Sequence, residues 1–165
     1  MPAPLDSVDR MVDEWKLERP DLDITPSAVV IRISILAHAF QIELKRFFAE
    51  NGLSKADFEV LAALRRRGSP YALSQHEIVH VARRSSGTVS FRIDRLESGG
   101  FVRRIPDPAD ARSVIVELSE KGKRLVDRIA PAHLANESRL LSALSKREQT
   151  ELATLLRKLV LHNSG

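Results

Sequence analysis

The sequence predicts a mainly α-helical protein with a small β-hairpin wing, built as a winged helix-turn-helix plus a helical dimerisation region. Two short helices with a brief connection are indicated between Leu73 and Gly100, and two β-type runs follow at Phe101–Ile105 and Ser113–Leu118. Longer helical patterns flank this block on both sides. A length of 165 residues suits one domain, or one lobe with an oligomerisation element.

The chain divides into three regions on this interpretation. Residues 1–52 are expected to form N-terminal dimerisation helices, residues 53–118 the winged helix-turn-helix lobe, and residues 119–165 C-terminal dimerisation helices. The first region begins with an amphipathic helix from Asp6 to Arg19, which Pro20 ends because proline disfavours helix in the residue before it.

A long second helix follows, with Thr25 as its N-cap and Pro26 at its first position. Its apolar residues repeat at intervals of three and four up to about Asn51, and Gly52 closes it. In the lobe, Ser54 with Asp57 marks the start of the next helix by a capping box.

The helix-turn-helix itself is marked by start and stop signals. A short strand at Tyr71–Ala72 is expected to join the wing sheet, and the first short helix covers Leu73–Glu77 and beyond, with Ser74 and Glu77 as its capping box. The second helix starts near Ser85 and stops at Gly99-Gly100. Its core positions are Val89, Ile93 and Leu96.

Two further helices close the chain. Ser119 caps a helix that runs to about Leu144 and that Pro131 should kink or divide, and Ser145 with Glu148 starts the last helix. The apolar stripes of the terminal helices suit either an interface between two chains or a monomeric core, and periodicity alone does not decide. We favour a homodimer, because two-fold DNA sites are most simply read by two-fold dimers.

Composition narrows the function classes. The chain has no cysteine, which excludes disulfides and thiolate chemistry, and it has no nucleophile motif, phosphate loop or metal-ligand spacing. We therefore expect no catalytic residues, no cofactor and no metal. No apolar run reaches the roughly 20 residues of a membrane span and the N-terminus lacks signal-peptide features, so we expect a cytoplasmic protein without a membrane partner.

Positive charge is concentrated on the predicted lobe. The net charge is +4, but residues 65–124 hold 13 Lys and Arg against 7 Asp and Glu, and the rest of the chain has 13 against 15. A surplus of this size alone is typical of a solvated face; its coincidence with the helix-turn-helix favours binding of double-stranded DNA.

The candidate DNA contacts come from the second helix and the wing. Hydroxyls and cations at the start of the helix can reach base edges or phosphates, although one of Ser85 and Ser86 surely caps the helix. Arg112 is the candidate for the minor groove with Asp110 holding its guanidinium, or the two are an unrelated turn aspartate and surface arginine. The candidate contacts are Ser86, Thr88, Ser90, Arg92, Arg95, Arg103, Arg104, Asp110 and Arg112.

From about Val8 to His162 the chain resembles the MarR family of bacterial transcriptional regulators. The likeness rests on the helical order and on two wing motifs, Asp110-x-Arg112 and Leu96-Glu97-x-Gly99-Gly100-Phe101-Val102-x-Arg104. The segment Trp15-x3-Arg19-Pro20-Asp21-Leu22-Asp23, with Gly52-Leu53 and Pro70-Tyr71-Ala72-Leu73, is similar to the urate-responsive subgroup. Ala111 departs from the pattern, because many family wings carry a second arginine there.

The resemblance implies a triangular homodimer with intertwined terminal helices, which represses at a pseudo-palindromic operator and leaves it on binding a small aromatic or anionic ligand such as urate. The subgroup's ligand residues fall by motif on Trp15, Glu59, Arg66 and Arg92, where Glu59 replaces the usual aspartate. An arginine fork suits a carboxylate or urate-like anion and a tryptophan can stack on its ring. Otherwise Trp15 is core, and Glu59 with Arg66 is a structural ion pair.

Two other functions remain open at this stage. One is a winged-helix DNA-binding protein without small-molecule input, which a ligand panel would separate. The other is a protein–protein adaptor, which the basic surplus and Arg112 disfavour and a salt titration on random duplex would test.

Overall fold

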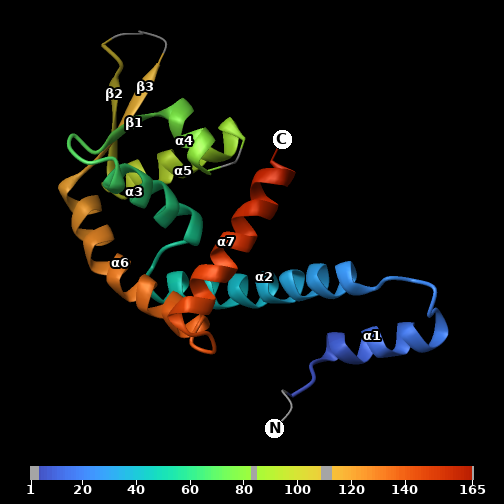
Figure 1. Cartoon of the computed structure of the whole chain (residues 1–165). Coiled ribbons are helices and arrows are strands. Elements are labelled where there is room, and N and C mark those ends of the chain that lie inside the picture. The colour runs from blue at the N-terminus through green and yellow to red at the C-terminus, as the bar shows by residue number, and fades with distance from the viewer. Residues whose placement is uncertain (1–3, 83–84, 109–112, 165) are drawn as a thin grey trace. The chain divides into compact units, whose positions relative to one another are not determined.

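The computed structural model describes residues 4–82, 85–108 and 113–164, and it confirms the mainly helical winged-helix fold (Figure 1). The chain forms two compact units, one up to Phe47 and one from Phe48 onward. The first unit holds α1 (Ser7–Glu18) and most of α2 (Thr25–Glu50). The second holds the last turn of α2 and all later elements.

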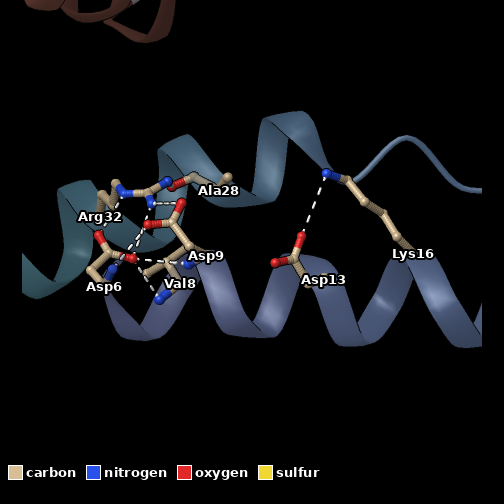
Figure 2. A network of polar contacts seen from close by, with 7 residues as sticks. All are labelled: Asp6, Val8, Asp9, Asp13, Lys16, Ala28 and Arg32. Atoms are coloured by element: carbon tan, nitrogen blue, oxygen red, sulfur yellow. Dashed lines mark hydrogen bonds and ion pairs between the residues drawn. The ribbon is translucent and has the colours of Figure 1, made fainter. Parts of the chain in front are cut away.

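An ion-pair cluster joins the two helices of the first unit (Figure 2). Asp6 caps α1 by accepting hydrogen bonds from the backbone N–H groups of Val8 and Asp9. Arg32 of α2 binds the Asp6 carboxylate at 2.9 Å and that of Asp9 at 2.6 Å. The guanidinium of Arg32 lowers the pKa of Asp6 to about 2. One arginine therefore holds the start of α1 against α2.

The apolar side of α1 is only partly covered in the single chain. Val8 is buried, whereas Trp15 is 45 % exposed and Leu17 is 81 % exposed. The cluster at the helix start therefore anchors α1 near Val8 and leaves its later turns open in the single chain.

The sequence indicates no apolar run of membrane-spanning length, and α2 is the exception to this expectation. Among the described residues, α2 is 26 residues long and meets the length and composition of a membrane span. Its apolar side chains lie on several faces and are exposed in the single chain, as Val30, Leu36 and Ile42 are. A helix that must be covered by another helix passes the same test.

The second unit is built around a three-stranded antiparallel sheet of β1 (Ala72–Ser74), β2 (Val102–Pro106) and β3 (Val114–Leu118). The strand order is β1-β3-β2, with Leu73 opposite Val116 and Arg104 opposite Val116 on the other side. Helices α3 (Lys55–Arg66), α4 (Gln75–Ala82) and α5 (Ser86–Ser98) pack beside it. The expected strand before α4 is confirmed, but it starts at Ala72 and takes Leu73 and Ser74 from the predicted helix.

The remaining helices are α6 (Glu120–Leu140) and α7 (Lys146–Asn163). The prediction that Pro131 divides the helix after Ser119 is wrong: α6 continues through Pro131, and it ends at Leu140 rather than near Leu144. The capping box of Ser145 and Glu148 starts α7 as expected. The apolar stripe of α7 is exposed in the single chain, and it comprises Leu152, Leu155, Leu156, Leu159 and Val160.

Buried side chains of the second unit form one core beneath the sheet and helices. Val89, Ile93 and Leu96 are buried as the sequence predicts. Phe48 is buried and its ring lies 4.9 Å from that of Phe58. This core fixes how α3, α5 and α6 present their outer faces.

Candidate nucleic-acid interface and ligand site

The outer face at the start of α5 is polar and open. Ser85 is the N-cap and accepts a hydrogen bond from the Thr88 backbone N–H at 3.4 Å. Ser86 and Thr88 are exposed and Ser90 is half-buried, while Val89 faces the core. Because helix N-terminal amides and short hydroxyls suit phosphates and base edges, this end of α5 fits the reading helix of a helix-turn-helix.

The wing is a hairpin of β2 and β3. Asp110 and Arg112, which come between the two strands in the sequence, lie outside the described residues, so their contacts remain predictions. The exposed Arg103 on β2 pairs with Glu117 of β3 at 2.8 Å. This pair crosses the two strands and leaves the Arg103 stem over the sheet.

Arg104 joins the wing to α5. Its guanidinium lies 2.6 Å from both Asp94 and Glu97, and its backbone N–H donates to Glu97 at 2.8 Å. These hydrogen bonds hold the pKa of Glu97 below its usual range. With its side chain only 24 % exposed, Arg104 serves as a clamp between strand and helix in this state of the protein.

A buried carboxylate joins α3 to α5. Asp57 is the buried charged residue of the described part of the chain, at 2 % exposed. It forms an ion pair with Arg95, and its Oδ1 lies 3.7 Å from Nη1 of Arg92. Arg95 also donates to the Ser54 hydroxyl at 3.2 Å. The same aspartate closes the capping box with Ser54, so the start of α3 and the middle of α5 share one set of charges.

This cluster is incompletely satisfied. Within the described residues, Asp57 Oδ1 and Arg92 Nε are buried and have no hydrogen-bond partner. Arg95 and Asp57 line a cavity of about 510 Å³ together with Leu53, Leu96 and Phe101. Buried polar atoms without partners are unfavourable. Of the residues in this cluster, Asp57 and Arg95 are the ones that a molecule in this cavity would meet.

Of the four predicted ligand residues, Trp15 lies on α1, Glu59 and Arg66 lie on α3 and Arg92 lies on α5, and their joint role in a ligand site stays a prediction. Glu59 is exposed and pairs with Lys55 at 2.6 Å rather than with Arg66, which is exposed at the end of α3. Of the four, only Arg92 belongs to the buried cluster. Trp15 lies in the other compact unit and is partly exposed.

Asp57 is the residue that sequence reasoning missed. It was recognised only as the partner of Ser54 in a capping box, a role that explains the residue fully at the local level. Its pairing with α5 depends on contacts 35 and 38 residues away, at Arg92 and Arg95, which no local pattern displays. A capping acid followed by a helix carrying Arg-x-x-Arg is the one signal that could have indicated it.

Metal-ligand side chains do not form a site within the described ranges. No three His, Cys, Asp or Glu side chains group there as metal ligands. The rings of His76 and His80 on α4 lie 4.6 Å apart as a pair.

Comparison with known proteins identifies the family. The MarR family model matches residues 53–114, which span the lobe from α3 to the start of β3. The regulator PecS of Dickeya dadantii is 39% identical over 155 residues, covering 94% of this chain and 93% of PecS. The chain belongs to the MarR family. Its relatives are transcriptional regulators and not enzymes, and it is accordingly a DNA-binding transcriptional regulator of the MarR type.

Two further similarities are informative. The transcriptional repressor NicR of Pseudomonas putida is 31% identical over 143 residues, covering 84% of this chain and 89% of NicR. The solved structure of Bordetella bronchiseptica BpsR, whose DNA binding is regulated by 6-hydroxynicotinic acid, aligns with a TM-score of 0.70 at 27% identity, covering 79% of this chain and 97% of BpsR.

Proposed function

We propose that this MarR regulator is a homodimeric repressor that leaves its operator when a small aromatic or anionic ligand binds. The observation that carries the proposal is the Asp57–Arg92–Arg95 cluster, because it connects a ligand-sized cavity to the reading helix α5. The name of NicR supports repression, and the description of BpsR supports an aromatic carboxylate as the regulating ligand. Its site of action is the cytoplasm, where the operator is.

The DNA contacts are proposed to come from the start of α5 and from the wing. Ser86, Thr88 and Ser90 would meet base edges or phosphates in the major groove, and Arg112 would enter the flanking minor groove. Arg103 and Arg95 are exposed enough to reach phosphates. Arg104 contributes by holding the wing against α5 rather than by direct contact.

The dimer is proposed to cover the apolar surfaces of α2 and α7. Both helices expose aliphatic side chains in the single chain, and contiguous apolar surface of this kind marks an interaction site. A helical interface between two copies would explain why α2 is apolar on several faces without a membrane role. It would also present two reading helices to the two halves of an operator.

Ligand binding is proposed to act by competition for arginine. An anion in the cavity would take hydrogen bonds from Arg92 or Arg95 in place of Asp57, because a guanidinium fork binds carboxylate or urate-like groups well. Both arginines are on α5, so their displacement would shift the reading helix and lower the affinity for DNA. Urate is the first ligand to test, with Trp15 and Arg66 as further residues of the proposed site; Glu59, paired with Lys55, is left outside it and supplies the control.

The test uses a labelled duplex from the intergenic region beside the gene for this chain. Fluorescence anisotropy measures binding of the wild type, Asp57→Asn and Glu59→Gln with increasing urate or 6-hydroxynicotinate. The two variants remove one negative charge each from α3. We expect the ligand to release wild type and Glu59→Gln from DNA at similar concentrations, and Asp57→Asn at a clearly different one.

A different outcome would contradict each part of the proposal. A wild type that binds random duplex as well as the intergenic duplex would reject operator recognition. A wild type that binds the operator but responds to neither ligand would reject this ligand class and leave DNA binding intact. An identical response of the two variants would remove Asp57 from the mechanism.

A further inference from the structure

A second cavity, next to that of the Asp57 cluster, is lined by cations. It has a volume of about 420 Å³ and lies between α6 and the segment that joins α2 to α3. Lys121, Arg124 and Arg128 line one side, and Asn51, Leu125 and Phe101 complete it. None of its described lining residues is acidic. Positions 121, 124 and 128 repeat at three and four residues, so the three cations form one stripe along α6.

Two of these cations have no carboxylate to balance them. Most of the described arginines of the second unit are paired, as Arg65 is with Asp127 at 2.7 Å on the neighbouring side of α6. Among the described residues, neither Arg124 nor Arg128 forms an ion pair, and both are exposed. Adjacent unpaired cations repel each other, and an anion between them would remove the repulsion.

The third cation is held in place. Lys121 donates to the carbonyl oxygen of Gly99 at 2.7 Å and lies 4.7 Å from the centre of the Phe101 ring. The cavity wall behind it is rigid, because Ser119 donates to the Phe101 carbonyl and a Cβ at Gly122 would lie 2.2 Å from that oxygen. A fixed ammonium, two free guanidinium groups and an aromatic ring make a preorganised anion site.

The cavity lies at the end of the sheet and of α5 that is opposite the wing turn and Ser86. Phe101 and Ser119 are at the ends of β2 and β3 opposite the hairpin turn, where α6 leaves the sheet (Figure 1). Gly99 caps the C-terminal end of α5, about 20 Å along the helix from Ser86. A duplex at the start of α5 and the wing turn would not place its phosphates in this cavity.

From this geometry we propose that the cavity binds a small organic anion with two or more negative charges, held by Arg124, Arg128 and Lys121. A di- or tricarboxylate or a phosphate ester has the matching chemistry, with its carbon skeleton against Phe101 and Leu125. The cations of this cavity are not those of the Asp57 cluster, although the two cavities share Gly52, Leu53 and Phe101 in their linings. Lys121 donates to the carbonyl oxygen of Gly99, so an anion bound to Lys121 would affect the C-terminal end of the reading helix α5.

The probes are citrate and inorganic phosphate, with singly charged benzoate for comparison. Isothermal titration calorimetry of the whole protein at low ionic strength measures the binding of each of these anions. We expect citrate and phosphate to bind and benzoate to bind much more weakly. Arg124→Gln and Arg128→Gln should each weaken citrate binding about tenfold, the effect of losing one charge-assisted hydrogen bond.

Arg157→Gln is the matched control, because it removes the same charge from an exposed position on α7. It should leave citrate binding unchanged, and melting curves without ligand check that all variants are folded. No binding of citrate or phosphate by wild type would overturn the proposal, as would equal losses in Arg157→Gln.

A DNA measurement separates the small anion from a phosphate of the duplex. Arg124→Gln and Arg128→Gln should bind random duplex with the same salt dependence as Arg157→Gln. A lower affinity and a shallower salt slope in these two variants alone would assign the stripe to DNA and overturn the small-anion site.

Discussion

At the scale of single residues, many charged side chains of the described chain form ion pairs, and the side chains that do not follow this pattern are the candidates for binding a ligand. Arg104 and Arg103 are bound to carboxylates of α5 and β3, whereas Arg124 and Arg128 are not bound to any in the described chain. Asp57 differs again, since it is buried and serves two arginines at once. Charge count alone therefore says little about which cations meet a ligand.

Replacing Asp57 tests its structural role. Asp57→Asn should lower the free energy of unfolding by about 1–3 kcal/mol, because Arg92 and Arg95 lose their carboxylate and Arg92 is largely buried. Glu59→Gln should change it far less, since its pair with Lys55 is exposed. Urea unfolding of both variants measures the difference. Equal losses of unfolding free energy in the two variants would show that Asp57 stabilises the fold no more than the exposed Glu59 does.

The wing is tested through Arg112. Arg112→Ala should weaken operator binding by about 1–3 kcal/mol if its contact resembles a good base-reading pair. Anisotropy titrations on the operator duplex measure it, with Arg157→Ala as a control of equal charge. Unchanged affinity of the Arg112 variant would remove the wing turn from the interface.

At the scale of elements, local signals predict starts better than ends. The capping boxes of Ser54 and Ser145 begin α3 and α7 where expected, because a cap is formed by residues within one turn. The sequence predicts the strand at Tyr71–Ala72 and a helix from Leu73, whereas β1 covers Ala72–Ser74. The local pattern misses these bounds because a three-residue strand exists only through its pairing with β3. Long-range pairing also explains why Asp57 was missed.

Pro131 is a second position where the local pattern predicts the wrong helix bounds. Proline removes one hydrogen bond from a helix and usually interrupts it, yet α6 passes through it without a break. On either side of Pro131, buried Ile129 and half-buried His133 tie the helix to the core. Tertiary packing overrides the local preference here.

The pairing of α1 with α2 gives a prediction for acid. The ordinary pKa of an aspartate is 3.8, and Arg32 lowers that of Asp6 to about 2 in the folded chain. A lowered folded pKa means that the contact is fully stabilising above about pH 4 and is lost as the pH falls toward 2. We expect α1 to detach over this range.

Trp15 reports this detachment, because it is the one tryptophan of the chain and lies on α1. Its fluorescence should change between pH 4 and 2 in wild type, and Arg32→Gln should show the acid spectrum already at neutral pH. Asp13→Asn is the control, since Asp13 only pairs with exposed Lys16 at 3.8 Å. A wild-type spectrum in Arg32→Gln at neutral pH would contradict the anchoring role of the cluster.

At the scale of the whole molecule, the single chain is incomplete in a specific way. Its winged-helix unit has a closed core, whereas α2 and α7 expose aliphatic side chains along their lengths. Sequence periodicity located these stripes but did not distinguish an inner core from an interface, because both need the same spacing. The exposed stripes of the folded chain favour the interface.

Leu155→Glu on α7 tests this. Leu155 is 57 % exposed in the single chain, so a charge there should leave the fold of one chain intact but prevent two chains from packing together. Light scattering should then give a mass near 18.5 kDa instead of twice that value. Operator affinity should fall steeply, because each half-site is bound by one chain alone.

Thr154→Glu supplies the matched control, since Thr154 is the preceding residue on α7, outside the leucine stripe, and is also exposed. It adds the same charge to the same helix and should leave a dimer with unchanged affinity for the operator. If Leu155→Glu remains a dimer that binds the operator as wild type does, the stripe on α7 is not the interface. The two reading helices would then have to be joined by another surface, with α2 the remaining apolar helix to carry it.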